Sequence, residues 1–127
     1  MAVAYLDTQI AVWLYHGDAR KLTRSAGRII DSHDLLISPM VYLEFDYLLR
    51  SRRVDDSAGT IFSALSSQLG IAICGLPFSL VADLAIENGW TSDPFDKIIA
   101  AQARANQNAP LITSDETIRA NYANAVW

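Results

Sequence analysis

The sequence is poor in the residues that build disulfides, zinc sites and histidine-based catalytic centres. Cys74 is the only cysteine among 127 residues, and His16 and His33 are the only histidines. A single cysteine excludes an internal disulfide and a cysteine zinc site, and favours a buried, reduced thiol in a cytoplasmic protein. The two histidines show neither HExxH nor any other metal-ligand spacing, so we do not expect histidine to carry the chemistry.

Long apolar runs are absent as well. No run approaches the roughly 18 residues expected of a membrane span. The beginning, MAVAYLDTQIAVWLY, lacks a basic stretch and is interrupted by Asp7, so we expect neither a signal peptide nor a membrane protein. The net charge of -4 disfavours a polyanionic partner at first sight. Without the five acids singled out below, however, nine acids remain against 10 Lys and Arg, and the rest of the surface is near neutral.

The chain has the size and balance of one compact domain, since 51% of its residues are hydrophobic and 19% are charged. Short apolar runs alternate with amphipathic segments, which predicts an α/β domain with a short parallel sheet flanked by helices. Strands are expected at residues 3–6, 35–38, 70–74 and 110–113, and near Val126. Helices are expected at residues 8–15, 25–32, 39–50, 57–68, 77–88 and 94–105, and around Ile118.

Acidic residues follow the predicted strands in a suggestive way. Asp7 comes directly after the first strand and Asp115 comes after the fourth. Ligands of open parallel sheets bind at the carboxyl ends of the strands, so these two acids are expected to converge there. Glu44, Asp93 and Asp96 lie near the starts of helices that can point into the same crevice. Clustered carboxylates repel one another, and a hard divalent cation such as Mg²⁺ or Mn²⁺ reverses that cost.

Each acid also has a purely structural explanation. Asp7, Asp93 and Asp115 could be helix N-caps, with Pro94 at a first helical position and Asp96 reaching back to Asp93 in a capping box. Glu44 could be a solvated residue on a helix face. Singly, the acids leave both alternatives open, whereas their joint placement favours a common site.

Four motifs occur together in this order: YLDT at residues 5–8, SPMVYLEF at 38–45, SDPFDKIIAAQA at 92–103 and LITSDE at 111–116. With them, essentially the whole chain resembles the PIN-domain family, specifically the VapC-type toxin ribonucleases of type II toxin-antitoxin systems. The resemblance implies a single PIN domain over residues 1–127 with a PIN-like three-layer fold. It also implies an acidic pocket that binds Mg²⁺ or Mn²⁺ and hydrolyses single-stranded or loop RNA.

The resemblance assigns roles by position. Four acids match the catalytic quartet of the family: Asp7, Glu44, Asp96 and Asp115. The implied metal ligands are Asp7, Asp96, Asp115 and Asp93. Three hydroxyl residues are expected to orient water or a carboxylate: Thr8, Thr113 and Ser114. Six basic side chains are candidates for contacts with RNA phosphates: Arg20, Lys21, Arg50, Arg52, Arg53 and Lys97.

The resemblance further implies a cognate VapB-like antitoxin and a homodimer. Trp13, Tyr42 and Tyr47 are candidates for the antitoxin groove, although aromatic residues at helical spacing are more often core. Without a histidine or lysine motif for another mechanism, water is the expected nucleophile, giving 5′-phosphate and 3′-hydroxyl products. One alternative is a non-catalytic PIN-like module that binds a metal or a protein. A receiver-like phosphotransfer domain is disfavoured because Asp7 stands alone and LITSDE offers no lysine.

Overall fold

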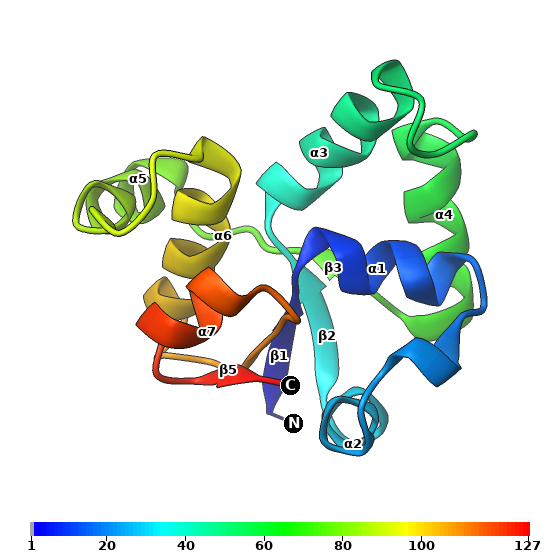
Figure 1. Cartoon of the computed structure of the whole chain (residues 1–127), viewed down its shortest axis with the longest axis horizontal. Coiled ribbons are helices and arrows are strands. Elements are labelled where there is room, and N and C mark those ends of the chain that lie inside the picture. The colour runs from blue at the N-terminus through cyan, green and yellow to red at the C-terminus, as the bar shows by residue number, and fades with distance from the viewer. Residues whose placement is uncertain (1) are drawn as a thin grey trace.

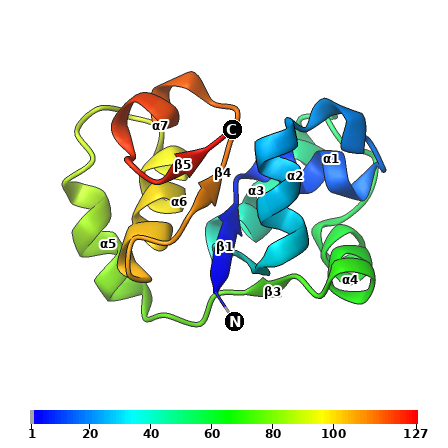
Figure 2. The same cartoon turned by 90° about the horizontal axis from the view of Figure 1, so that it is seen from below.

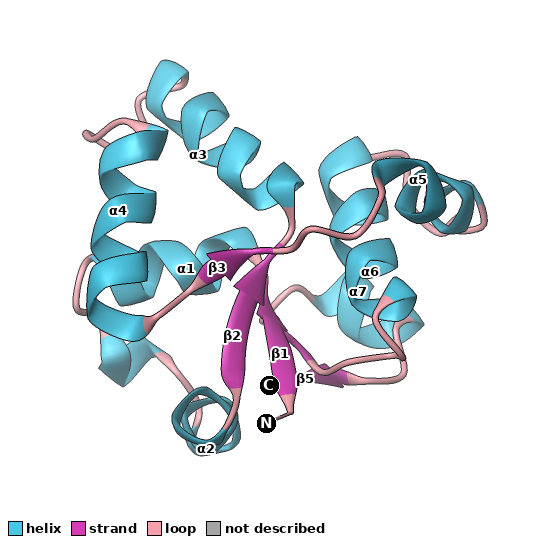
Figure 3. Cartoon of the chain, turned by 180° about the vertical axis from the view of Figure 1, so that it is seen from behind, coloured by secondary structure: helices cyan, strands magenta, loops and turns pink. Residues whose placement is uncertain are grey.

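A five-stranded parallel sheet forms the centre of the computed structural model, which describes residues 2–127 (Figure 3). The strand order is β3-β2-β1-β4-β5, and all four pairings are parallel. The strands are β1 (Val3–Leu6), β2 (Asp34–Ile37), β3 (Ala72–Ile73), β4 (Leu111–Ile112) and β5 (Ala125–Val126). Parallel strands are joined by crossovers, so helices cover both faces of the sheet.

The helices divide between the two sides of the sheet. They are α1 (Thr8–Tyr15), α2 (Arg24–Ser32), α3 (Pro39–Arg50), α4 (Ala58–Leu69), α5 (Phe78–Ile86), α6 (Pro94–Ala105) and α7 (Glu116–Asn121), with a 3-10 helix at Ala19–Lys21. Helices α1 to α4 lie on one side and α5 to α7 on the other (Figures 1 and 2). The predicted fold class, a three-layer α/β fold with a short parallel sheet, is confirmed.

The central strand β1 is buried on both faces, as a middle strand of a parallel sheet should be. Ala4, Tyr5 and Leu6 are each at most 1% exposed and belong to the main core. A smaller apolar cluster joins α5 to α6. Cys74 is a buried free thiol, as expected, and accepts a hydrogen bond from the Tyr5 hydroxyl at 3.0 Å. Within residues 2–127, no helix is both long and apolar enough to cross a bilayer.

Three strands differ from their predicted bounds: β4, predicted at residues 110–113, is confined to Leu111–Ile112, and β2 and β3 differ for local reasons. Strand β2 lies one residue earlier than predicted. It ends at Ile37 because Ser38 leaves the sheet to cap α3, accepting a hydrogen bond from the Met40 N–H at 3.1 Å. Strand β3 is only two residues long, since Gly70 adopts a left-handed conformation (φ 67°) that ends α4. Both residues are therefore boundaries of helices rather than strand residues.

Candidate functional site

The five acids predicted to converge do lie together. Asp7, Glu44, Asp93, Asp96 and Asp115 all line one cavity of about 220 Å³. Thr8, Gln9, Leu48 and Arg53 complete its lining. The residues that line it follow β1 and β4 or lie in α1, α3 and α6, and α3 contacts both α1 and α6. Folding therefore joins acids that are up to 108 residues apart in the chain.

Three of the acids are also helix N-caps. The Asp7 carboxylate accepts a hydrogen bond from the Thr8 N–H at 2.8 Å at the start of α1. Asp93 caps α6 in the same way, and Asp115 caps α7. An N-cap carboxylate satisfies a helix N–H that has no partner within the helix. The fold thus explains why these three acids are present, while their carboxylates still face the cavity.

Glu44 and Asp96 cap no helix. The predicted capping box is wrong, because the Asp93 N–H donates to the Thr91 hydroxyl at 3.1 Å rather than to Asp96. Among residues 2–127, no group donates a hydrogen bond to the Asp96 carboxylate. Glu44 is not simply solvated, since its carboxylate accepts a hydrogen bond from the Thr8 hydroxyl. Capping and hydrogen bonding therefore leave Asp96 unexplained, and of the local features only its place in the first turn of α6 favours an acid there.

Two threonine hydroxyls hold the carboxylates in place. Thr8 joins α1 to Glu44 of α3. Thr113, fully buried after β4, donates to Asp7 at 2.6 Å and accepts from the Asp115 N–H at 3.0 Å. Ser114, the third predicted supporting residue, is half-buried beside Asp115 and has no hydrogen bond to an acid within residues 2–127.

The electrostatics of the cavity oppose several simultaneous negative charges. Burial is the main cause that raises the pKa of Asp7 and of Glu44, and neighbouring carboxylates add to it. Burial, followed by the charges of Asp93, Asp115, Asp7 and Glu44, raises the pKa of Asp96 to about 7. A cation among these carboxylates would relieve both the burial cost and the repulsion.

The donor set suits Mg²⁺ or Mn²⁺, because it consists of carboxylate oxygens without nitrogen or sulfur. The side chains are not arranged as a closed cage: across residues 2–127, no three His, Cys, Asp or Glu side chains form a group that could hold an ion. Hydrogen bonds explain this, since Asp7 is held by Thr8 and Thr113 while Asp93 and Asp115 each use one oxygen as a cap. Asp96 is the one of the five acids whose carboxylate accepts no hydrogen bond within residues 2–127.

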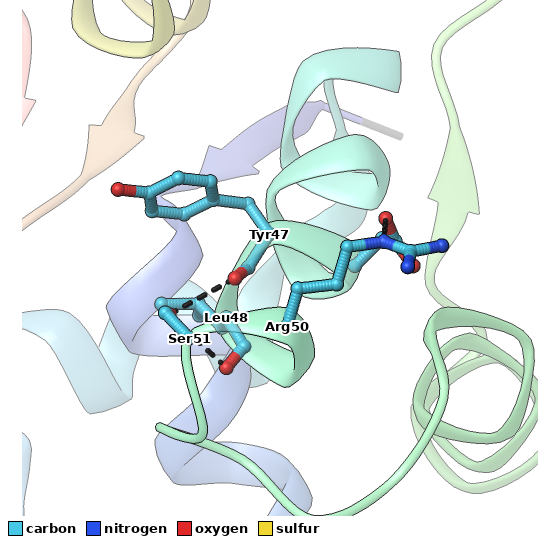
Figure 4. A network of polar contacts seen from close by, with 5 residues as sticks. Tyr47, Leu48, Arg50 and Ser51 are labelled. Carbon is cyan, nitrogen blue, oxygen red and sulfur yellow. Dashed lines mark hydrogen bonds and ion pairs between the residues drawn. The ribbon is translucent and has the colours of Figure 1, made fainter.

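The predicted RNA-binding residues are dispersed. Arg53 is the one that lines the cavity. Arg50 (Figure 4) forms an ion pair with Asp46 at 2.7 Å within α3, and Lys21 pairs with Asp18 at 3.5 Å. The remaining three are outside the cavity lining: Arg20, Arg52 and Lys97. A role in RNA binding stays a prediction for all six.

Sequence reasoning missed two lining residues. Gln9 follows Thr8 at the start of α1, and Leu48 lies one helical turn after Glu44. The four-residue spacing from Glu44 could have indicated Leu48, because residues i and i+4 share a helix face. No comparable signal marks Gln9.

The three aromatic candidates for an antitoxin groove have different surroundings. Trp13 packs on Trp127 with ring centroids 5.9 Å apart, and Tyr42 contacts Phe62 edge-on at 5.7 Å. Both are partly buried against the main core. Tyr47 is 48% exposed, so it is the one of the three that presents a large surface to solvent.

Replacing Thr113 by valine should destabilise the protein. The change keeps the shape but removes the hydroxyl that links Asp7 to the Asp115 N–H. We expect a loss of about 1 kcal/mol in the free energy of unfolding and a further rise in the pKa of Asp7. Urea unfolding at pH 7 measures the first effect, with Thr113→Ser as the control that retains the hydroxyl. Equal stability of Thr113→Val and the parent protein would show that these hydrogen bonds of Thr113 add nothing to the free energy of unfolding.

Solved structures share this fold. The chain is similar to VapBC2 from Rickettsia felis bound to a DNA fragment from their promoter, with a TM-score of 0.67 and 20% identity over 97% of this chain and 95% of that one. It is also similar to a toxin-antitoxin complex from Klebsiella pneumoniae (TM-score 0.63, 18% identity, 98% and 96% covered). VapBC-1 from nontypeable Haemophilus influenzae gives a TM-score of 0.50 with 18% identity, covering 89% and 87%.

No curated protein matches the sequence. The PIN domain family, however, matches residues 4–124, a range that contains all five acids of the cavity, strands β2, β3 and β4, and all of β1 except Val3. The chain therefore belongs to the PIN domain family.

Proposed function

We propose that this protein is a metal-dependent endoribonuclease and the toxin of a VapBC-like type II toxin-antitoxin system. The observation that carries the proposal is the cavity in which five carboxylates of a PIN domain face one another. Asp96 supports it most directly, because neither capping nor hydrogen bonding accounts for a half-buried carboxyl at that position.

In this proposal Asp7, Asp96 and Asp115 hold Mg²⁺ or Mn²⁺, with Asp93 as a further ligand. The bound ion would stabilise negative charge on the reacting phosphate and lower the pKa of water. Glu44, fixed by the Thr8 hydroxyl, would orient the attacking water. Arg53 is placed to contact a phosphate of the RNA at the cavity rim.

The partner proposed is a VapB-like antitoxin, and the protein is proposed to act as a cytoplasmic homodimer. The support is that two structures with the same fold over nearly their whole length are toxin-antitoxin complexes. An antitoxin that places a basic side chain in the cavity would meet complementary charge there.

The ends of the cleaved RNA test the proposal. The protein, freed of any bound inhibitor, should cut single-stranded RNA with Mg²⁺ or Mn²⁺ and stop cutting with EDTA. The products should carry 5′-phosphate and 3′-hydroxyl ends, because the cavity offers no histidine or lysine to assist attack by the 2′-hydroxyl. Ligation-based sequencing of the 5′ ends detects them directly. Absence of cleavage by metal-loaded protein would favour a non-catalytic binding module instead.

A further inference from the structure

An aromatic pair, formed by the exposed Tyr47 and the partly buried Phe95, lies beside residues of the acidic cavity. Tyr47 of α3 is 48% exposed, and its ring centroid is 5.5 Å from that of Phe95, at an interplanar angle of 49°. Phe95 directly precedes Asp96, and Tyr47 is three residues after Glu44, on the same side of α3. In Figure 4 the Tyr47 ring projects from α3 on the side away from Arg50.

The side chain of Arg53 connects this aromatic pair to the cavity. The Arg53 guanidinium lies 5.8 Å from the Tyr47 ring centroid, and Arg53 also lines the acidic cavity. Within residues 2–127, Arg53 forms no ion pair with a carboxylate. An aromatic face, a guanidinium and the cluster of carboxylates therefore follow one another along a continuous surface.

We propose that Tyr47, Phe95 and Arg53 form a stacking platform for one unpaired nucleobase of the RNA substrate, next to the phosphate that enters the cavity. This rests on the proposed nuclease function. Aromatic side chains and arginine bind bases of single strands by stacking, and a base held in a duplex cannot present its face in this way. A stacked base must be unpaired, so this platform agrees with the single-stranded or looped substrate of the proposed function.

A protein partner is the competing occupant of this face, because Leu43, 55% exposed, lies one turn before Tyr47. The position of Arg53 favours RNA instead. It contacts the aromatic ring and the cavity at once, so a nucleotide that stacks on Tyr47 meets a cation suited to its own phosphate.

The test measures RNA binding by fluorescence anisotropy on the Asp96→Asn protein, which keeps the RNA intact. Tyr47→Ala in this background should weaken binding of a labelled single-stranded decamer by about 5- to 100-fold. Tyr47→Phe, which keeps the aromatic face, should stay within about twofold, and Arg53→Gln should weaken binding. Phe78→Ala, the matched control, removes an aromatic side chain that is 58% exposed on α5 outside the cavity, and should change nothing.

A series of decamers, each with one abasic position, locates the stacked base. At one position the missing base should weaken RNA binding by the Asp96→Asn protein with Tyr47 intact. The same missing base should not weaken binding further when Tyr47→Ala is also present, because the base and the ring make one shared contact. Unchanged RNA affinity of Tyr47→Ala, or a change confined to oligomeric state or binding of a protein partner, would overturn the platform. Neither result touches the nuclease proposal, which fails separately if the parent protein, loaded with Mg²⁺ or Mn²⁺ and freed of any inhibitor, does not cleave RNA.

Discussion

Replacing Asp96 by asparagine should lower the rate of RNA cleavage by about 100- to 1,000-fold while leaving the protein folded. The expected loss follows from removing a negative oxygen that would help to hold the cation at the reacting phosphate. The fold should tolerate the change because Asp96 caps no helix and accepts no hydrogen bond from residues 2–127. Cleavage of a labelled single-stranded RNA at fixed Mg²⁺ and Mn²⁺ concentrations measures the effect.

The stability of this variant distinguishes a role of Asp96 in cleavage from a role in folding. Without metal at pH 8, Asp96→Asn should melt at a higher temperature than the parent, because a half-buried charge that faces four other carboxylates is gone. Asp83→Asn is a matched control: Asp83 is exposed on α5, outside the cavity, and should affect neither cleavage nor melting. A folded Asp96→Asn protein with full activity would remove Asp96 from the site.

The sequence was informative where one residue decides local structure. Pro39 and Pro94 each open a helix as predicted, whereas Gly70, predicted to begin a strand, ends a helix instead. The prediction that acids directly after strands converge was also confirmed, because an acid after a parallel strand lies at the edge of the sheet where the other strands end. Asp7 and Asp115 could therefore be placed together before the sheet order was known.

Other features depended on contacts between distant residues. Nothing local indicates that Thr8 bonds to Glu44 or that Thr113 bonds to Asp7, since each pair forms only when helices and strands are assembled. The length of β3 was overestimated because apolar residues at 70–74 suit a strand equally well whether one or two of them pair with β2. The exposed Tyr47 ring could not be told from a core aromatic by its spacing.

The capping roles explain why single acids were ambiguous. Asp7, Asp93 and Asp115 each begin a helix and also line the cavity, so the structural and chemical explanations hold together. The helices they cap begin where the cavity lies. The positive ends of α1 and α6 thereby partly compensate the gathered negative charge. Asp96 and Glu44 lack a capping role, which makes them the more discriminating positions for mutation.

The metal-free protein should be less stable at pH 8 than at pH 5. The pKa of Asp96 is raised from an ordinary 3.8 to about 7, so between these values the folded state binds a proton that the unfolded chain does not. Stability therefore falls as the pH rises from about 4 to 7. Between pH 5 and the folded pKa of about 7, this shift corresponds to about 3 kcal/mol before solvent screening is considered, and screening of the partly exposed carboxyl reduces the effect to about 1–2 kcal/mol. The raised pKa values of Asp7 and Glu44 act in the same direction.

Urea unfolding at pH 5 and pH 8 in EDTA measures this difference, and the Asp96→Asn variant should reduce it by the share that Asp96 carries. Added Mg²⁺ or Mn²⁺ should raise the melting temperature more at pH 8 than at pH 5, because protons and the cation compete for the same carboxylates. Equal stabilisation by metal at both pH values would mean that the cation binds elsewhere. If Asp96→Asn left the rise in melting temperature with metal unchanged, Asp96 would be excluded as a metal ligand. The five acids would still line one cavity, and the neighbouring carboxylates would still help to raise the pKa of Asp96.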